Sequence, residues 1–356
     1  MYIKGNRFRK PENAVVERKS EKISGRRSKF PHLVKLIIFT LIFAIEIFLR
    51  VANYNLIGTN ESMSRQGRNS KQISHNNYIM EEKLILLKAR LKEAKSAVIA
   101  FSGGVDSTFL ARIAKDVYGD NLLLVTATSS TYPFYELEEA KSLANLLGIK
   151  HKIIVSEEID IPGYSDNPPD RCYYCKSELF GKIKYIASQE GYEAVFDGSN
   201  ADDLKDFRPG MKAKLEKGVI SPLADSGFTK NDIRHFSAIL NLPTATKQSY
   251  ACLASRFPYG EKITKIKLDR LAIAEFEVRK LGFTQFRIRS HENLARFEFI
   301  PAEMDKAWGI KSILAEICQK SGFNYITIDL SGYRTGSMNE VLSESEKKDY
   351  QKPHIK

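Results

Sequence analysis

Four short strand-like runs, separated by helical patterns, constrain the fold of this chain more than any other feature. The runs cover residues 97–101, 122–127, 152–155 and 194–196, and each is short and mainly apolar. Such runs are typical of strands that are buried on both faces of a parallel sheet. The alternation of strands and helices predicts an α/β fold with a Rossmann-like, doubly wound parallel sheet.

The helices between these strands are predicted from apolar spacing and end signals. Gly148 follows one pattern as a C-cap, and Thr229 precedes another as an N-cap. The predicted helices cover residues 81–95, 107–118, 136–147, 177–189 and 230–240.

The pattern changes after Pro258, where helix, strand, strand, helix and strand follow one another. The predicted bounds are 265–281, 283–289, 294–299, 302–321 and 325–330. This order predicts a small C-terminal α+β domain with an antiparallel strand pair. We therefore expect an N-terminal extension at 1–79, a nucleotide-binding domain at 80–257, the small domain at 258–345 and a polar tail at 346–356.

The charge of the chain is concentrated in the extension. Residues 1–79 hold 15 Lys and Arg against 5 Asp and Glu, and so carry +10 of the formal net charge of +12. The rest of the chain is nearly neutral, which argues against the basic surface of a nucleic-acid-binding protein. We expect no nucleic-acid partner.

The extension contains an apolar stretch at residues 33–49. Its uncharged part, between Lys35 and Glu46, is ten residues long, whereas a membrane span needs about 20 apolar residues. We expect an extension outside the functional enzyme, either disordered or not translated, and a cytoplasmic protein. A membrane anchor and an interfacial amphipathic helix are the alternatives.

The loop Ser102-Gly103-Gly104-Val105-Asp106-Ser107 follows the first predicted strand and opens a helix. Its glycines let backbone amides approach an anion, its hydroxyls donate to phosphate oxygens, and a helix N-terminus favours negative charge. The Asp106 carboxylate suggests a Mg²⁺ ligand or a helix cap. The loop lacks the Gly-Lys-Ser/Thr of a Walker A motif.

This hexapeptide resembles the signature of the PP-loop ATP pyrophosphatases. The resemblance implies that ATP is cleaved to AMP and pyrophosphate, that an oxygen of the substrate is adenylated, and that adenine lies near Ala127 and Thr128. The loop Asp197–Asp203 resembles a second segment of that superfamily. Its carboxylates, Asp202 and Asp203 among them, would serve Mg²⁺ or the acyl end of the substrate.

Three cysteines indicate which family within this superfamily the chain resembles. Cys172 and Cys175 lie in a predicted loop that enters a helix, and Cys252 lies in Ala-Cys-Leu-Ala-Ser-Arg. With the phosphate loop, the segments 171–176, 197–210 and 251–259 resemble the LarE family of sulfur transferases over about residues 80–345. Cys318, within an apolar helix, is expected to be a buried structural residue, and Trp308 to be a core residue.

The LarE resemblance implies a specific reaction. Such enzymes adenylate a carboxylate of pyridinium-3,5-biscarboxylic acid mononucleotide and convert it to a thiocarboxylate, for the nickel-pincer nucleotide cofactor of lactate racemase. In one branch a single cysteine, here Cys252, gives up its own sulfur. In another branch three cysteines, here Cys172, Cys175 and Cys252, hold a 4Fe–4S cluster, which we expect here. A zinc site and a Cys172–Cys175 disulfide remain alternatives.

Other residues enter through the same resemblance. Arg287 and Arg289 alternate on a predicted strand and share a face. With Arg256 they are the expected binders of the substrate phosphate. Glu275 and Glu298 match positions that bind metal ions, with ordinary surface charges as the alternative.

The expected partners are a small-molecule nucleotide substrate, ATP, Mg²⁺ and further copies of the chain. Alternative functions are an ammonia-dependent synthetase of the NAD, GMP or asparagine type, a tRNA thiolase, and a nucleotide-binding regulator without activity. The cysteines argue against the first, the near-neutral charge of residues 80–356 against the second, and the intact phosphate loop against the third.

A chain that starts at Met80 should fold, stay in solution and keep full activity, because no predicted site residue lies in the extension. Its ATP-dependent pyrophosphate release should equal that of the full chain. N-terminal sequencing of the native protein provides a direct check. Recovery of the enzyme in washed membranes, with activity lost on truncation, would contradict the prediction.

Overall fold

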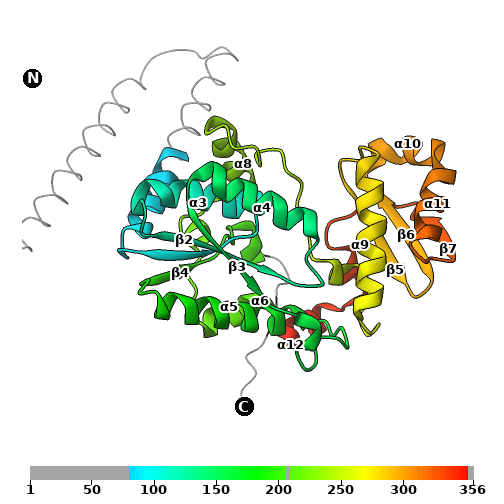
Figure 1. Cartoon of the computed structure of the whole chain (residues 1–356), viewed down its shortest axis with the longest axis horizontal. Helices are drawn as coiled ribbons and strands as arrows, with labels where there is room; N and C mark the ends of the chain where they lie inside the picture. Colours follow the sequence, from blue (N-terminus) through cyan, green and yellow to red (C-terminus); the bar gives the residue numbers. More distant parts are fainter. Residues whose placement is uncertain (1–79, 206–208, 352–356) are drawn as a thin grey trace, which may run out of the picture. The chain divides into compact units, whose positions relative to one another are not determined.

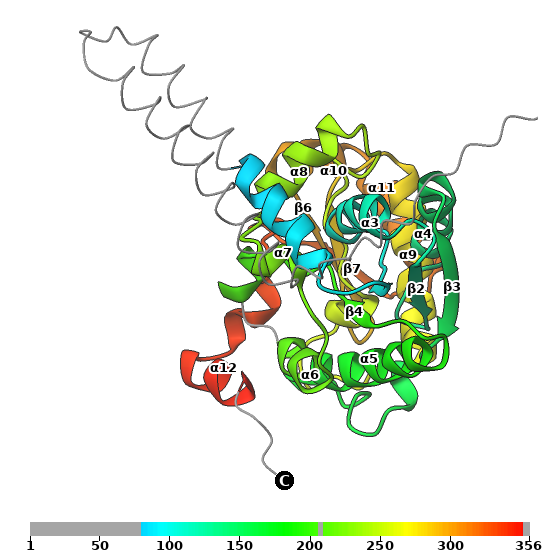
Figure 2. The same ribbon diagram turned by 90° about the vertical axis from the view of Figure 1, so that its left-hand side faces the viewer.

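The computed structural model describes residues 80–205 and 209–351, drawn in colour in Figures 1 and 2. The predicted extension at 1–79, its apolar stretch and residues 352–356 lie outside this part. Among the described helices, none combines the length and the apolar character that a membrane span requires.

The first sheet consists of four parallel strands in the order β3-β2-β1-β4. Apolar side chains fill β1, β2 and β4, as expected of strands covered on both faces. The parallel sheet is therefore confirmed, with strand ends within two residues of the predicted ones. The strands are β1 (Ala97–Ala100), β2 (Leu122–Thr128), β3 (Lys150–Val155) and β4 (Ala194–Phe196).

Helices cover both faces of this sheet (Figures 1 and 2). α3 (Val105–Tyr118) and α4 (Phe134–Leu147) pack with Ala97 and Ile99 in one apolar cluster. Val98 faces the other way and packs with α5 (Arg171–Gln189) in a second cluster. This alternation along β1 is the two-residue period of a strand, and it confirms the doubly wound arrangement.

Several helix ends follow the predicted signals. Gly148 caps α4 in the left-handed conformation, with φ 61° and ψ 40°. Thr229 caps α8 (Lys230–Ile239) in a capping box with Asp232. The first helix covers 80–91 and ends four residues before the predicted end at 95. The shorter elements are η1 (Glu158–Asp160), η2 (Asp202–Lys205), α6 (Gly210–Glu216), α7 (Pro222–Asp225) and η3 (Leu253–Arg256).

The second sheet has the order β5-β6-β7, with β5 and β6 antiparallel and β6 and β7 parallel. This confirms the predicted small sheet. Its core includes the stacked rings of Phe297 and Phe299, 5.3 Å apart, and the buried thiol of Cys318. Its elements are α9 (Lys265–Lys280), β5 (Phe286–His291), β6 (Leu294–Phe299), η4 (Pro301–Glu303), α10 (Met304–Gly309), α11 (Lys311–Lys320) and β7 (Tyr325–Ile328).

The apolar core of the second sheet also takes in residues that precede the predicted domain boundary at 257/258. Tyr164, Leu253 and Phe257 are buried in it. The segments around the cysteines therefore share a core with the C-terminal sheet, and the boundary stays a prediction.

Three local predictions were wrong. α5 begins at Arg171, with Pro168 and Pro169 just ahead of its N-cap Asp170, so Cys172 and Cys175 lie near the start of a helix and not in a loop. The predicted helix 302–321 is divided at Ile310, next to a glycine that disfavours helix. Trp308 is 64% exposed and lies under the Lys311 ammonium instead of in the core.

The C-terminal part of the described chain forms two short helical elements. η5 (Ser337–Val341) precedes α12 (Glu344–Gln351). Ser343 and Glu346 exchange hydrogen bonds between side chain and backbone, which is a capping box at the start of α12. The predicted polar tail at 346–356 therefore begins within a helix, and its separation from the small domain stays a prediction.

Candidate active site at the carboxyl ends of the parallel strands

The loop Ser102–Ser107 connects β1 to α3 and closes on itself through its hydroxyl groups. The Oγ atoms of Ser102 and Ser107 lie 3.2 Å apart, and the Gly104 amide donates to Ser102 Oγ at 3.4 Å. Val105 is buried and begins α3. Backbone amides and two hydroxyls therefore gather at a helix N-terminus, which is a site suited to phosphate.

Two glycines allow neighbouring elements to approach this loop. Gly103 has a φ of 64°, and a Cβ there would lie 3.1 Å from Cα of Ala140 in α4. Gly198 follows β4, and a Cβ there would lie 3.0 Å from the Ser107 amide nitrogen. The loops after β1 and β4 thus meet at backbone distance, as the predicted crevice requires.

Asp106 is a half-buried carboxylate of this crevice, and it forms an ion pair with Lys230 at the start of α8. Burial raises the pKa of the Asp106 carboxyl, Lys230 lowers it, and nearby Asp203 raises it. Its Oδ1 atom is buried without a hydrogen-bond partner. An unpartnered buried carboxylate oxygen beside an anion-binding loop fits a Mg²⁺ ligand.

The loop after β4 supplies the other side of the crevice. Asp202 Oδ2 accepts a hydrogen bond from the Lys230 amide at 2.8 Å, and Asp203 Oδ2 accepts one from the Asn200 amide at 3.0 Å. The Asn200 Nδ2 atom is buried and has no hydrogen-bond partner. Both predicted carboxylates therefore shape this loop, and Asn200 directs an unused donor within it.

Sequence reasoning missed several residues of the crevice. Lys247 Nζ donates to the Gly103 carbonyl at 3.2 Å and pairs with Glu136 at 2.8 Å, and Tyr132 Oη donates to the Ser102 carbonyl at 3.0 Å. Lys230 was missed as well. A lysine just after the N-cap Thr229 opposes the helix dipole, and this was a usable signal that it has another role. Lys247 and Tyr132 reach the loop only through tertiary contacts.

Ala127 and Thr128, the predicted neighbours of adenine, end β2 and are half-buried. Because β2 is paired with β1 in parallel, these two residues lie beside the carboxyl end of β1. Their position at the carboxyl ends of the strands is where ligands bind in open α/β sheets.

The three predicted cysteines come from two elements, α5 and the segment before η3. Cys175 Sγ donates to Glu158 Oε1 at 3.7 Å, and Thr131 Oγ1 donates to Glu158 Oε2 at 3.2 Å. The Leu253 amide donates to the Thr131 carbonyl at 3.0 Å. Thr131 and Glu158 therefore connect the Cys175 turn to the chain next to Cys252.

The thiols lie close enough to change one another's pKa values. Burial raises the pKa of Cys252, Cys172 raises it further, and the Arg171 guanidinium lowers it. Burial and Glu158 raise the pKa of Cys175. All three thiols are free, so the structure contains no Cys172–Cys175 disulfide.

The arrangement of these thiols bears on whether they can bind a metal. Within residues 80–205 and 209–351, no three or more His, Cys, Asp or Glu side chains are arranged to hold a metal ion. Three free thiols close together fit a 4Fe–4S cluster in the kind of donor they supply. They do not form a preassembled metal site.

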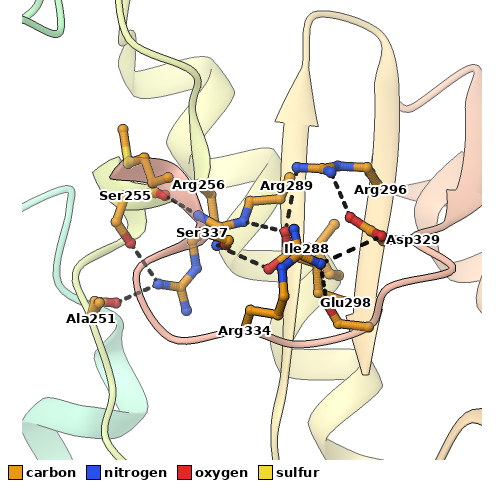
Figure 3. Close-up of polar contacts among 12 residues, drawn as sticks. Ala251, Ser255, Arg256, Ile288, Arg289, Arg296, Glu298, Asp329, Arg334 and Ser337 are labelled. Atoms are coloured by element: carbon orange, nitrogen blue, oxygen red, sulfur yellow. Dashed lines mark hydrogen bonds and ion pairs between the residues drawn. The ribbon is translucent and has the colours of Figure 1, made fainter. Parts of the chain in front are cut away.

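The predicted phosphate-binding and metal-binding residues of the C-terminal domain pair with one another (Figure 3). Arg256 forms a two-pronged ion pair with Glu275, with N–O distances of 2.8 and 3.1 Å. Arg289 pairs in the same way with Glu298, at 3.0 and 2.9 Å, and donates to Ser337. These four side chains are buried, so the glutamates are not ordinary surface charges.

Arg287 differs from its two predicted partners. Its guanidinium lies 4.7 Å from the ring centre of Tyr333 and has no hydrogen-bond or ion-pair partner in the described part of the chain. Burial lowers its pKa, and Arg256 lowers it further. An unpaired, partly buried guanidinium is the strongest anion-binding candidate of the three.

Comparison with known proteins gives four findings. The NAD synthase family matches residues 79–165. A protein of Synechocystis sp. is 44% identical over 75% of this chain and 100% of its own length. The pyridinium-3,5-bisthiocarboxylic acid mononucleotide synthase of Lactiplantibacillus plantarum is 35% identical over 73% of this chain and 95% of its own. The chain belongs to the LarE-type family. A protein of Methanocaldococcus jannaschii is 31% identical over 71% of this chain.

As a LarE-type protein, the chain is a PP-loop enzyme that uses ATP. The groups at its phosphate loop fit that ligand. Backbone amides and two hydroxyls gather at the start of α3, Asp106 Oδ1 has no hydrogen-bond partner in the described residues, and Gly103 and Gly198 leave no room for side chains. The predicted fold class and family are therefore confirmed.

Replacing Gly198 with alanine should displace the phosphate loop, because the new Cβ would meet backbone atoms of Ser107. We expect ATP-dependent pyrophosphate release to fall by about tenfold or more, since displacements near 1 Å cost rate steeply. Gly181→Ala is the matched control: it lies in α5 with nothing within 4 Å of its Cβ position. Equal activity of the two variants would contradict the role of Gly198.

Proposed function

We propose that this protein is an ATP-dependent sulfur transferase that acts on pyridinium-3,5-biscarboxylic acid mononucleotide. It adenylates one carboxylate of this substrate and converts it to a thiocarboxylate, releasing AMP and pyrophosphate. The observation that carries the proposal is the joint presence, in a LarE-type chain, of the phosphate loop with its unpartnered Asp106 oxygen and of three neighbouring free thiols.

In the first step the chain positions ATP for attack by the substrate carboxylate. Ser102 to Ser107 bind the phosphates, with Asp106 holding Mg²⁺ and Ala127 and Thr128 lying against adenine. The carboxylate oxygen attacks the α-phosphorus, the bond to the β-phosphate oxygen breaks, and pyrophosphate leaves. Lys230, now paired with Asp106, is a cation close enough to take up charge that develops on the phosphates.

In the second step a sulfur nucleophile attacks the carbonyl carbon of the acyl adenylate, and the bond to AMP breaks. Cys172, Cys175 and Cys252 would hold a 4Fe–4S cluster. Three thiolates leave one iron without a protein ligand, so the bound cluster would supply hydrosulfide for this step. In the alternative, Cys252 attacks by itself, and cleavage of its Cβ–S bond leaves dehydroalanine.

The nucleotide substrate needs a phosphate site, which we assign to Arg287. The absence of an ion-pair partner on its guanidinium supports this role. The other two arginines predicted from the sequence, Arg256 and Arg289, are each engaged by a buried glutamate. Asp202 and Asp203 would face the acyl end of the substrate. Metal binding by Glu275 and Glu298 would require both to leave their arginine partners.

The product would enter the synthesis of the nickel-pincer nucleotide cofactor of lactate racemase. We propose that the enzyme works in the cytoplasm, where ATP is available, as an oligomer of identical chains. Its catalytic unit would comprise the segments 80–257 and 258–345. An ammonia-dependent synthetase is the second candidate, supported by the NAD synthase match at 79–165. Amide formed from ammonia, with no thiocarboxylate formed, would favour it.

The purified protein should cleave ATP to AMP and pyrophosphate in the presence of the nucleotide substrate and Mg²⁺. Asp106→Asn should lower the rate by about 100-fold, because it removes the charge that would hold Mg²⁺. Asp116→Asn is a suitable control, since Asp116 pairs with Arg112 on the exposed side of α3. Formation of ADP and orthophosphate would disprove the assignment.

The three cysteines should act as one unit in binding iron. Alanine at Cys172, Cys175 or Cys252 should each remove most of the iron and the visible absorption of protein purified without oxygen. Cys318→Ala should keep both, because this thiol lies alone in an apolar core.

A different result would identify the sacrificial mechanism. In that case the Cys172 and Cys175 variants would keep full sulfur transfer, and Cys252→Ala would abolish it. The mass of the wild-type chain would also fall by one sulfur and two hydrogens after turnover. This outcome would overturn the cluster while leaving the sulfur transferase in place.

A further inference from the structure

The segment that carries Cys252 is held in place by a buried guanidinium four residues further on. Arg256 Nη1 donates to the Ala251 carbonyl at 2.7 Å and lies 3.4 Å from the Cys252 carbonyl. It also donates to Ser255 Oγ at 2.9 Å, and Ser255 Oγ donates to the Cys252 carbonyl at 2.8 Å. The backbone on either side of the Cys252 Cα is therefore fixed by one side chain.

Arg256 is itself immobilised from α9. Its Nε and Nη2 atoms donate to the two oxygens of Glu275, and both residues are 2% exposed. Glu275 also accepts hydrogen bonds from the Tyr250 hydroxyl at 2.9 Å and the Ile288 amide at 3.3 Å. Each nitrogen of the guanidinium and each oxygen of the carboxylate thus has a partner within the protein.

A second buried pair supports the same segment from β5 and β6. Arg289, paired with Glu298, donates to the Ser255 carbonyl at 2.7 Å (Figure 3). On the opposite side the Leu253 amide donates to the Thr131 carbonyl at 3.0 Å. The Cys252 segment is therefore clamped between the loop after β2 and the C-terminal sheet.

We propose that Arg256, fixed by Glu275, is a positioning residue for Cys252 and not a ligand of the substrate phosphate. This inference rests on the proposed sulfur transfer. All three nitrogens of the Arg256 guanidinium already donate hydrogen bonds within the protein, so few N–H donors remain for a phosphate. The same hydrogen bonds determine where the Cys252 thiol lies. The clamp keeps that thiol next to Cys172 when the acyl adenylate is formed.

The test separates adenylation from sulfur transfer in the purified full chain. In Arg256→Lys and in Glu275→Gln, the KM for the nucleotide substrate in pyrophosphate release should stay within about twofold. The thiocarboxylate formed per AMP should fall by about tenfold or more. A rise in KM that accounts for the whole loss would instead identify Arg256 as a substrate ligand and overturn the proposal.

Arg270→Lys is the matched control. Arg270 lies on α9, as Glu275 does, and like Arg256 it donates to carbonyl oxygens. Its acceptors are those of Gly322 and Glu292 and not those of the Cys252 segment. Its thiocarboxylate yield per AMP should equal that of the wild type. If the thiocarboxylate yield of Arg270→Lys fell as much as that of Arg256→Lys, the loss would reflect general destabilisation of the protein, and the proposal would be overturned.

A second readout does not depend on the reaction. Hydrogen exchange of the Leu253 amide should speed up by about tenfold in Arg256→Lys and stay unchanged in Arg270→Lys, because the clamp limits opening of this segment. Unchanged exchange would refute the positioning role. If the wild type forms no thiocarboxylate, the proposed function fails, and this exchange still decides the inference.

A milder variant keeps the proposal testable even if Arg256→Lys does not fold. Ser255→Ala removes the hydroxyl that links Arg256 to the Cys252 carbonyl and leaves the ion pair intact. It should shift the thiocarboxylate yield and the Leu253 exchange in the same directions by smaller factors. If Arg256→Lys does not fold and Ser255→Ala changes neither quantity, the proposal is refuted.

Discussion

The arrangement of the candidate active site depends on the adjacency of β1 and β4 in a parallel sheet. Parallel strands end at the same edge, so the loop Ser102–Ser107 and the loop after β4 must meet there. Their contact is made at the backbone, through Gly198 and the Ser107 amide. This contact brings Asp106, Asn200 and Lys230 together, and it leaves two buried polar atoms without partners. The Asn200 side chain is near enough to Asp106 to lower the pKa of its carboxyl, so these polar groups meet at one edge of the sheet.

The cysteine segment depends on a different interaction, a pair of buried arginine–glutamate bridges. Each charge is stable inside the protein only because its partner and its remaining hydrogen bonds are present. Removing one partner from such a pair costs about 3–5 kcal/mol. The bridges Arg256–Glu275 and Arg289–Glu298 therefore tie the Cys252 segment firmly to the C-terminal sheet. Among the three arginines, only Arg287 has no ion-pair partner in the described part of the chain.

The sequence predicted the regular elements well where local signals were strong. β4 and β6 have the predicted bounds, and Gly148 and Thr229 cap helices as expected. Prediction failed where local and tertiary signals differed. Trp308 is apolar but lies at the surface, and α5 begins six residues before the predicted helix at 177–189.

The sequence by itself determined the family and supplied the candidate residues for its chemistry. A phosphate loop between a strand and a helix, and cysteines at 172, 175 and 252, are local patterns that need no fold to be recognised. Only the tertiary structure decided which charges are free. Arg256, Arg287 and Arg289 look alike in the sequence, since a guanidinium carries the same charge wherever it stands. Two of them are buried against glutamates from other strands and helices, and one is not, because pairing depends on neighbours that the fold brings together.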